Sequence, residues 1–308
     1  MPAKKSKLLI LGSTGLVGSR FIKIYQNKYS IITLGRSNTD TKVNLLSKKD
    51  LIQKIQKLGF DAIINFAAYT NVDGAEKEKG DKNGEVYTLN CLLPLWLTNY
   101  TKSFGCKLYH ISTDYVFSGT QSNRPYTEKD TPRPVNSWYA MTKYFGEENI
   151  LNSPGSETNC TIVRISYPYS GVYRRKLDIA RSVVEKLRNN EPYFGIEDQK
   201  IKPTSVDDIS QALSNLVKNE ATGIYHIAGN FHPKAYITPF NFAKKIAKLM
   251  NLNLAQVKPI PFAALSKKRI APRPQHTWLD TGKIEAFDLR ITPINKALKR
   301  FMNQMINK

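Results

Sequence analysis

The sequence is poor in cysteine, in histidine and in acidic residues, and each shortage excludes a class of protein. Its three cysteines are an odd number, widely spaced and without a CxxC pair, which argues against a disulfide framework and predicts a reducing compartment, the cytoplasm. The four histidines have no ligand spacing with one another or with the cysteines, so no metal site is expected. No apolar run approaches the length of a membrane span, and residues 8–11 are too short for the core of a signal peptide.

Basic residues outnumber acidic ones, 46 against 25, which gives a net charge of +21. Such a surface attracts nucleic acid, anionic membranes or phosphorylated small molecules. The lysines are spread along the chain, without an arginine-rich tail or an aromatic RNA-binding signature, so we expect neither a nucleic-acid nor a membrane partner. With 308 residues, 41% of them hydrophobic, the chain can form one large α/β domain or a domain with a smaller lobe.

The first half of the chain alternates between short β-branched runs and longer helical patterns. Strands are predicted at residues 7–11, 30–34, 61–65, 107–112 and 160–166, and helices at residues 16–27, 48–58, 83–104 and 136–152. This alternation predicts a Rossmann-type doubly wound parallel sheet, covered by helices on both faces, in the α/β class.

After residue 166 the alternation loosens, and loops rich in proline and glycine separate the helical patterns. These patterns lie near residues 179–189, 207–218 and 239–250. We therefore expect an NAD(P)-binding domain over residues 1–166 and a smaller substrate-binding lobe over residues 167–308. The two are expected to interleave, because no clean linker separates them.

Three glycines, Gly12, Gly15 and Gly18, follow the first predicted strand and open the first predicted helix. Glycines at this spacing allow a tight turn, close backbone approach to a pyrophosphate and close packing of helix on strand. The helix N-terminus adds unpaired N–H groups and a partial positive charge. The segment predicts a dinucleotide site.

The end of the second predicted strand indicates which dinucleotide. The segment reads Leu34-Gly35-Arg36-Ser37, without the acidic residue that NAD-specific sites carry for the ribose 2′-hydroxyl. Arg36 is suited to pair with a 2′-phosphate, and Ser37 can add a hydrogen bond. The sequence favours NADP(H) and leaves NAD(H) open.

Tyr139 and Lys143 lie four residues apart in a predicted helix, which places them on one face. The pair is either an ordinary surface contact, which is common at this spacing, or an acid and the ammonium that assists it. Taken alone, the two residues leave both interpretations open.

The order of motifs along nearly the whole chain resembles the extended short-chain dehydrogenase/reductase family, and more narrowly its dTDP-4-dehydrorhamnose reductase branch. The motifs are NFAAYTNVD at 65–73, ISTDYVFSG at 111–119, Tyr139-x-x-x-Lys143, VRIS at 163–166, DQ at 198–199 with PT at 203–204, and APRP at 271–274. The resemblance implies NADPH-dependent reduction of the 4-keto group of a nucleotide-linked 4-keto-6-deoxy sugar, a step of dTDP-rhamnose biosynthesis.

The resemblance also implies roles for individual residues. Tyr139 would protonate the substrate carbonyl as hydride arrives, Lys143 would stabilise the phenolate that remains, and Thr113 would fix the carbonyl oxygen. Further cofactor contacts are implied for Gly12, Thr14, Gly15, Leu16, Val17, Asn44, Leu45, Ala67, Ala68, Tyr69 and Thr70. Substrate contacts are implied for Val72, Asp114, Tyr167 and Arg273. Arg273 is expected on the nucleotide diphosphate, with a lobe-packing arginine as the open alternative.

The chain departs from the family pattern at several positions. Tyr167 stands where the family often has tryptophan, and Ile201 replaces a glycine of the DQ…PT segment, so the identity of the sugar stays open. Some members bind Mg²⁺ at a dimer contact through acidic residues, one of which would fall where this chain has Ser19-Arg20. The metal is therefore not expected here, and a homodimer stays open.

Three alternatives remain. The first is a nucleotide-sugar epimerase or dehydratase on the same scaffold. The dehydratase is disfavoured, because Thr113 is followed by Asp114-Tyr115 rather than by an Asp-Glu pair. A non-catalytic, NADP-binding regulatory subunit like the beta subunit of methionine adenosyltransferase can keep the same motifs. A nucleic-acid binder would have to show steeply salt-dependent binding.

Overall fold

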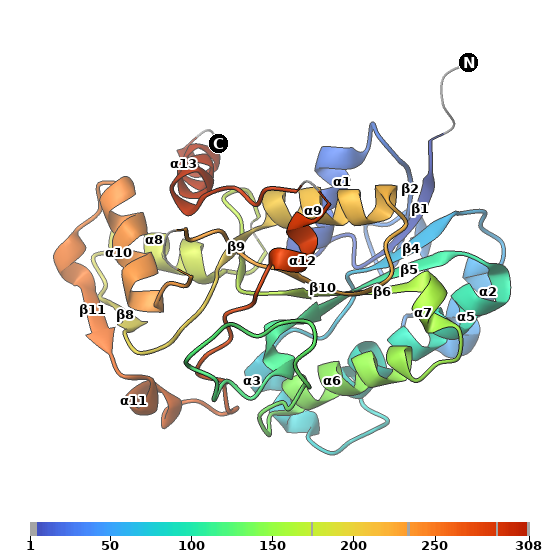
Figure 1. Ribbon diagram of the computed structural model, residues 1–308, viewed down its shortest axis with the longest axis horizontal. Helices are drawn as coiled ribbons and strands as arrows, with labels where there is room; N and C mark the ends of the chain where they lie inside the picture. Colours follow the sequence, from blue (N-terminus) through green and yellow to red (C-terminus); the bar gives the residue numbers. More distant parts are fainter. Residues whose placement is uncertain (1–4, 174, 233–234, 288, 307–308) are drawn as a thin grey trace.

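The computed structural model of the chain describes residues 5–173, 175–232, 235–287 and 289–306, which include a seven-stranded sheet (Figure 1). Its strands are β1 (Lys7–Leu11), β2 (Ser30–Gly35), β3 (Thr41–Lys42), β4 (Ala62–Asn65), β5 (Lys107–Thr113), β6 (Cys160–Ile165) and β10 (Gly223–Ile227). They are all parallel, in the order β10-β6-β5-β4-β1-β2-β3. The order reverses between β1 and β4, which is where doubly wound sheets bind ligands. The predicted Rossmann-type α/β fold is confirmed.

Helices cover both faces of the sheet because successive strand residues point to opposite sides. The covering helices are α1 (Leu16–Tyr25), α2 (Lys48–Ile55), α5 (Leu93–Phe104), α6 (Trp138–Leu151) and α9 (Val206–Lys218). Leu8 and Ile10 pack in one hydrophobic cluster with residues of α1 and α9, whereas Leu9 and Leu11 pack in another with residues of α2 and α5. In Figure 1, α1 and α9 lie above the sheet, and α5 and α6 lie below it. Burial on both faces explains the nearly continuous apolar strands.

The helix predicted over residues 83–104 is confirmed from residue 85 onward, but it contains a π-helical turn that was not predicted. The segment contains α4 (Glu85–Tyr87), a π-helical turn η2 (Thr88–Leu92) and then α5. Asn90 is buried in the π turn, where its amide exchanges hydrogen bonds with the backbone of Tyr69 and donates to the hydroxyl of Thr142 on α6. These tertiary bonds hold a turn that hydrophobic periodicity does not reveal.

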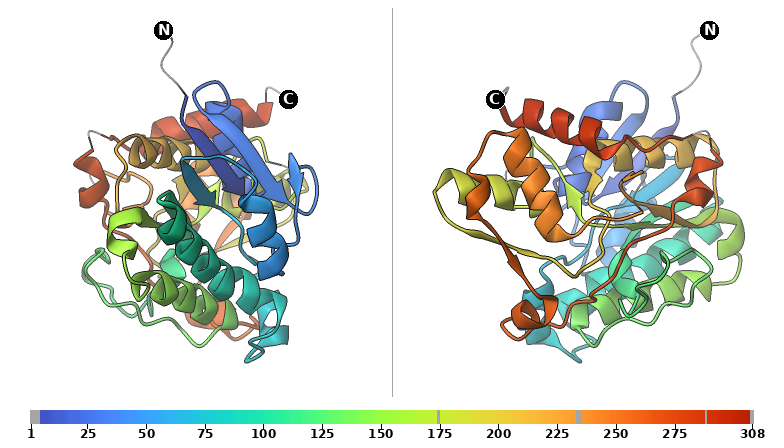
Figure 2. Two further views of the ribbon diagram at one scale, coloured as in Figure 1. Left: turned by 90° about the vertical axis from the view of Figure 1, so that its right-hand side faces the viewer. Right: turned by 60° about the vertical axis from the view of Figure 1, so that its left-hand side comes forward.

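A smaller lobe lies at the left of Figure 1, and the right-hand view of Figure 2 brings it forward. Its main elements are α8 (Ile179–Arg188), β8 (Tyr193–Ile196), α10 (Pro239–Leu249), β11 (Val257–Ile260) and α13 (Ile294–Ile306). Helices α8, α9 and α10 confirm the three helical patterns expected after residue 166. Because α9 and β10 return to the sheet after α8 and β8, the two parts interleave, and the boundary at residue 166 stays a prediction.

Short elements complete the chain and connect the two parts. They are α3 (Val72–Ala75), η1 (Glu76–Glu78), η3 (Asp114–Val116), α7 (Ser156–Asn159), β7 (Pro168–Tyr169), β9 (Thr204–Ser205), η4 (Leu254–Gln256), α11 (Phe262–Ser266) and α12 (Gly282–Glu285). Strands β7 and β9 pair in parallel, as do β8 and β11, each as a separate two-stranded sheet.

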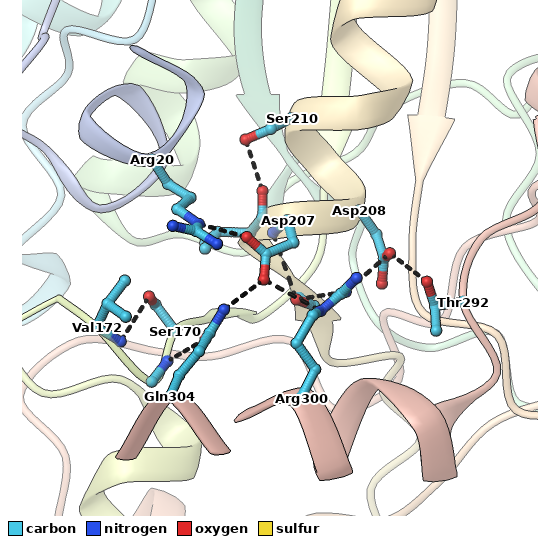
Figure 3. Close-up of polar contacts among 12 residues, drawn as sticks. Arg20, Ser170, Val172, Asp207, Asp208, Ser210, Thr292, Arg300 and Gln304 are labelled. Carbon is cyan, nitrogen blue, oxygen red and sulfur yellow. Dashed lines mark hydrogen bonds and ion pairs between the residues drawn. The ribbon is translucent and has the colours of Figure 1, made fainter. Parts of the chain in front are cut away.

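An ionic cluster joins the sheet to the lobe (Figure 3). Asp207, in the first turn of α9, accepts hydrogen bonds from Arg20 of α1 and Gln304 of α13. The neighbouring Asp208 accepts from Arg300 of α13 at 2.9 Å. Arg20 is thus neutralised within its own chain.

The described ranges contain no helix that is both long enough and apolar enough to cross a membrane. Within the same ranges, no three His, Cys, Asp or Glu side chains come together in a way that could hold a metal ion. Cys91, Cys106 and Cys160 are buried and form no disulfide.

Candidate active site

A cavity of about 670 Å³ extends from the glycine turn after β1 to the carboxyl end of β5. Gly12 and Gly15 line it at one end, and Thr113, Tyr139 and Lys143 line it at the other. Its volume is in the range of small-molecule and cofactor sites. The cavity therefore connects the predicted cofactor turn to the predicted catalytic residues.

The glycine turn packs too tightly for side chains. Gly12 has a φ of +74°, and a Cβ on it would lie 2.5 Å from the backbone nitrogen of Ala67. A Cβ on Gly18 would lie 2.5 Å from the carbonyl oxygen of Gly12. Beside the turn, the hydroxyl of Ser13 is buried and has no hydrogen-bond partner among the described residues. With Gly15 as the N-cap of α1, the turn fits a dinucleotide pyrophosphate.

The end of β2 carries the groups predicted to select the cofactor. Arg36 and Ser37 both line the cavity. The guanidinium of Arg36 is 72% exposed and lies 3.5 Å from the carboxylate of Glu85, which lines the cavity as well. Sequence reasoning missed Glu85, since only the packing of α4 brings it to the end of β2.

Tyr139 and Lys143 lie in the first two turns of α6, which begins after the N-cap Ser137. The Ser137 hydroxyl accepts a hydrogen bond from the N–H of Ala140, which fixes the start of the helix. Burial raises the pKa of Tyr139 above its ordinary value, while a hydrogen bond with Thr113 lowers it. Because burial is the larger cause, the phenol holds its proton at neutral pH.

Lys143 is buried beside β5. Its Nζ donates to the carbonyl oxygen of Ile111 at 2.8 Å and lies 3.2 Å from Nε2 of His110. Burial lowers the pKa of Lys143 to about 8, although the charge of Glu147 one turn later acts to raise it. Burial and the charge of Lys143 hold the pKa of His110 well below its usual range, so the imidazole is neutral.

The cavity ends among groups suited to a sugar. Asp114 is buried and accepts a hydrogen bond from Ser166 at 2.9 Å, and burial raises the pKa of this carboxyl to about 6. Tyr167 lines the cavity with a φ of +41°, an unfavourable conformation for a non-glycine residue, and its hydroxyl accepts from Gln199 at 3.1 Å. Tyr115 also lines this end of the cavity. It was not predicted as a site residue, although it lies inside the ISTDYVFSG motif at 111–119.

Most predicted site residues line the cavity. They are Gly12, Thr14, Gly15, Leu16, Val17, Arg36, Ser37, Asn44, Leu45, Ala67, Ala68, Thr70, Val72, Thr113, Asp114, Tyr139, Lys143 and Tyr167. Tyr69 and Arg273 are outside the set of residues that line it. Tyr69 packs against a cluster that includes Trp138. Arg273 forms an ion pair with Asp73 at 2.9 Å and donates to the carbonyl oxygen of Ala271.

The segment between β7 and α8 lies against the cavity and was not predicted. The hydroxyl of Tyr173 donates to the carbonyl oxygen of Thr14 at 3.4 Å, and Lys176 donates to that of Thr70 at 3.3 Å. Arg181 of α8 holds the segment through the carbonyl oxygens of Tyr173 and Lys176. Lys176 is visible in the sequence as a basic residue, but only the fold brings it to Thr70.

Comparison with known proteins identifies the family. Residues 6–307 match the model of the RmlD substrate binding domain family. The chain belongs to this family. The predicted resemblance to the dTDP-4-dehydrorhamnose reductase branch is thereby confirmed.

Relatives of this RmlD-family chain include proteins with different printed names. The dTDP-4-dehydrorhamnose reductase of Salmonella typhimurium is 27% identical over 311 residues, covering 97% of each chain. Methionine adenosyltransferase 2 subunit beta of Mus musculus is 27% identical over 304 residues, covering 95% of this chain and 86% of that protein. The crystal structure of dTDP-4-dehydrorhamnose reductase from Bacillus anthracis in complex with NADP has a TM-score of 0.83 and 25% identity, covering 97% and 99% of the two chains. Sequence identity does not separate the reductases from the subunit.

Proposed function

We propose that the chain is an NADPH-dependent reductase of the 4-keto group of a nucleotide-linked 4-keto-6-deoxy sugar. The observation that carries the proposal is one continuous cavity that joins a dinucleotide-binding turn to Thr113, Tyr139 and Lys143. Reductases of dTDP-4-dehydrorhamnose among the relatives, one of them solved with NADP, support the same cofactor and substrate class. When bound, the reduced nicotinamide supplies the hydride.

Tyr139 serves as the proton donor in this proposal. Its phenol is protonated at neutral pH because burial raises its pKa. It gives that proton to the carbonyl oxygen of the sugar as the carbonyl carbon accepts hydride, and the ketone becomes a secondary alcohol. Thr113, which lines the same cavity as Tyr139, is assigned to hold the same oxygen.

Lys143 lowers the energy of the phenolate that Tyr139 leaves behind. A nearby positive charge favours the charged form of an acid. With a pKa of about 8, Lys143 is mainly protonated at pH 7. Turnover should therefore fall above about pH 8, as the ammonium loses its proton.

The glycine turn would hold the pyrophosphate, and Arg36 with Ser37 would hold a 2′-phosphate. Arg36 would share its guanidinium between that phosphate and the carboxylate of Glu85, and this competition leaves room for NAD(H). Asp114, Tyr167 and Val72 would contact the sugar. Arg273 could reach the nucleotide diphosphate only by exchanging Asp73 for the phosphates, so this role stays a prediction.

The test is oxidation of NADPH, followed by absorbance, with dTDP-4-dehydro-6-deoxy-L-mannose generated in the assay. Tyr139→Phe should lower kcat by about 10² to 10⁴. The matched control is Tyr109→Phe, which removes a buried phenol whose hydrogen bond goes to Leu216, away from the cavity. The proposal fails if Tyr139→Phe keeps its turnover, or if the wild type binds NADPH but turns over none of the nucleotide 4-keto sugars supplied.

A non-catalytic subunit is the second candidate, because the mouse regulatory subunit is as similar in sequence as the bacterial reductase. Tight NADPH binding without turnover, together with copurification of a methionine adenosyltransferase, would support it. The homodimer, the cytoplasmic location and the absence of membrane or nucleic-acid partners stay predictions.

A further inference from the structure

Three buried side chains behind the cavity form a chain of contacts that the proposed mechanism does not use. Asn65 ends β4, His110 lies on β5, and Lys143 lies on α6. The Asn65 amide nitrogen is 3.1 Å from Nδ1 of His110, and Nε2 of the same ring is 3.2 Å from the Lys143 amine. Asn65 and His110 are both 0% exposed, so bulk solvent does not reach them and their hydrogen bonds are made within the protein.

The backbone determines which way the Asn65 amide points. The N–H of Ala67 lies 3.0 Å from the Asn65 oxygen, and a backbone N–H can only donate. The oxygen of Asn65 must therefore face Ala67, and its NH₂ group must face His110. A flipped amide would place two donors against each other on the Ala67 side and is excluded on that ground.

The direction of this amide selects the tautomer of His110. The NH₂ group of Asn65 donates to Nδ1, so Nδ1 carries no proton. The buried imidazole is neutral, and a neutral ring has one N–H, which must then be on Nε2. That N–H points at the amine of Lys143.

An N–H group facing an ammonium has no acceptor, whereas a neutral amine offers it a lone pair. We propose that Asn65 and His110 are positioning residues that hold an N–H group against Lys143 and thereby favour its amine over its ammonium form. The amine keeps two N–H groups, one for the carbonyl oxygen of Ile111 and one for the cavity. This inference rests on the proposed function only in assigning Lys143 a part in turnover.

Other titratable and charged groups surround α6 and have to be considered. They are Tyr139, Tyr144, Glu147 and Glu148 on the helix, His110 from β5, Asp114 and Tyr115 from η3, Arg164 on β6, Tyr87 on α4, Cys91 on η2, Glu76 on η1 and Asp73 on α3. Of these, Glu147 acts to raise the pKa of Lys143, and it is itself neutralised by a direct ion pair with Arg164. Among the described residues, His110 is the titratable group within hydrogen-bond distance of the Lys143 amine. Its N–H opposes the effect of Glu147 and lowers the proton affinity of Lys143.

The tautomer can be measured without substrate or turnover. Nitrogen NMR distinguishes a ring nitrogen that carries a proton from one that does not. The chain has four histidines, so the His110 signals are assigned by their loss in His110→Gln. We expect the proton on Nε2 in the wild type. A proton on Nδ1 would overturn the inference and leave the reductase proposal unaffected.

Two variants test the effect on Lys143. In His110→Gln the side-chain oxygen can replace Nε2 and accept from the ammonium, so the pKa of Lys143 should rise by about one unit, a tenfold change in proton affinity. In Asn65→Asp both oxygens accept, so the tautomer should switch to Nδ1–H and the pKa should rise as well. The pKa is followed by carbon NMR of labelled lysine, with the signal assigned by Lys143→Met.

Asn90→Asp is the matched control, since Asn90 is also a fully buried asparagine against α6 but bonds to Tyr69 and Thr142. It should leave the Nε2–H tautomer of His110 unchanged. The positioning role is refuted if the pKa of Lys143 is unchanged in His110→Gln. It is also refuted if the tautomer of His110 responds equally to Asn65→Asp and Asn90→Asp. If the wild type turns over substrate, the pH at which turnover declines should be about one unit higher in His110→Gln.

Discussion

The buried ion pair between Glu147 and Arg164 offers the sharpest test of how α6, the helix that carries Tyr139 and Lys143, is held. Glu147 lies on α6 one turn after Lys143, and Arg164 lies on β6. Three hydrogen bonds of 2.6, 3.1 and 3.1 Å join them, and both side chains are 0% exposed. The guanidinium also lies 5.0 Å from the ring centre of Phe117. Neither charge can be solvated by water if its partner is removed.

Arg164→Met should destabilise the protein by about 3–5 kcal/mol, because it leaves the Glu147 carboxylate buried and unpaired. With a urea dependence of about 3 kcal/mol per molar, the unfolding midpoint should fall by about 1 to 1.7 M. Adding Glu147→Leu to the same protein should recover most of this loss, since an apolar pair of similar volume replaces a buried ion pair at little cost. The two substitutions should therefore be strongly non-additive.

The assay is urea unfolding followed by far-UV circular dichroism without cofactor. Arg124→Met is the matched control, since Arg124 pairs with Asp130 on the surface and its side chain is 52% exposed. Its effect should be much smaller, because solvent screens the charges and solvates the remaining partner. The reasoning is refuted if both arginine variants lose the same stability, or if the double variant is as unstable as the sum of its single changes.

Three further predictions concern the cavity. Gly12→Ala should abolish NADPH binding in calorimetry while the chain still unfolds cooperatively, because the new Cβ would lie 2.5 Å from the nitrogen of Ala67; unchanged affinity would contradict this. Glu85→Gln should raise the preference for NADPH over NADH several-fold by freeing Arg36, and Arg36→Ala should lower it; equal ratios of Kd in all three proteins would contradict the competition. The free energy of unfolding of the wild type should fall by about 3 kcal/mol as the pH rises from about 4 to about 6. The native Asp114 carboxyl keeps its proton up to about pH 6, whereas the carboxyl in the unfolded chain loses it near pH ~4. Asp114→Asn should remove this decline, and a pH profile parallel to the wild type would show that another group causes it.

The local parts of the fold and site could be predicted from the sequence. The glycine turn at Gly12 is recognisable because only glycine tolerates its positive φ and the close approach of Ala67. The pair of Tyr139 and Lys143 is visible through helical spacing alone. By contrast, Arg273 could not be placed, because its partner Asp73 on α3 lies far away in the sequence, and only the fold brings the two together.

The sequence by itself therefore determined the parallel sheet, the cofactor turn and the helix that carries Tyr139, since each depends on a local pattern of burial or spacing. The tertiary structure alone decided the environment of those groups. It set Glu85 against Arg36 and placed the His110 ring between Asn65 and the Lys143 amine. These contacts join elements distant in the chain, and no periodicity encodes them. For His110 and Lys143, the effects on charge arise only when folding removes water from around them.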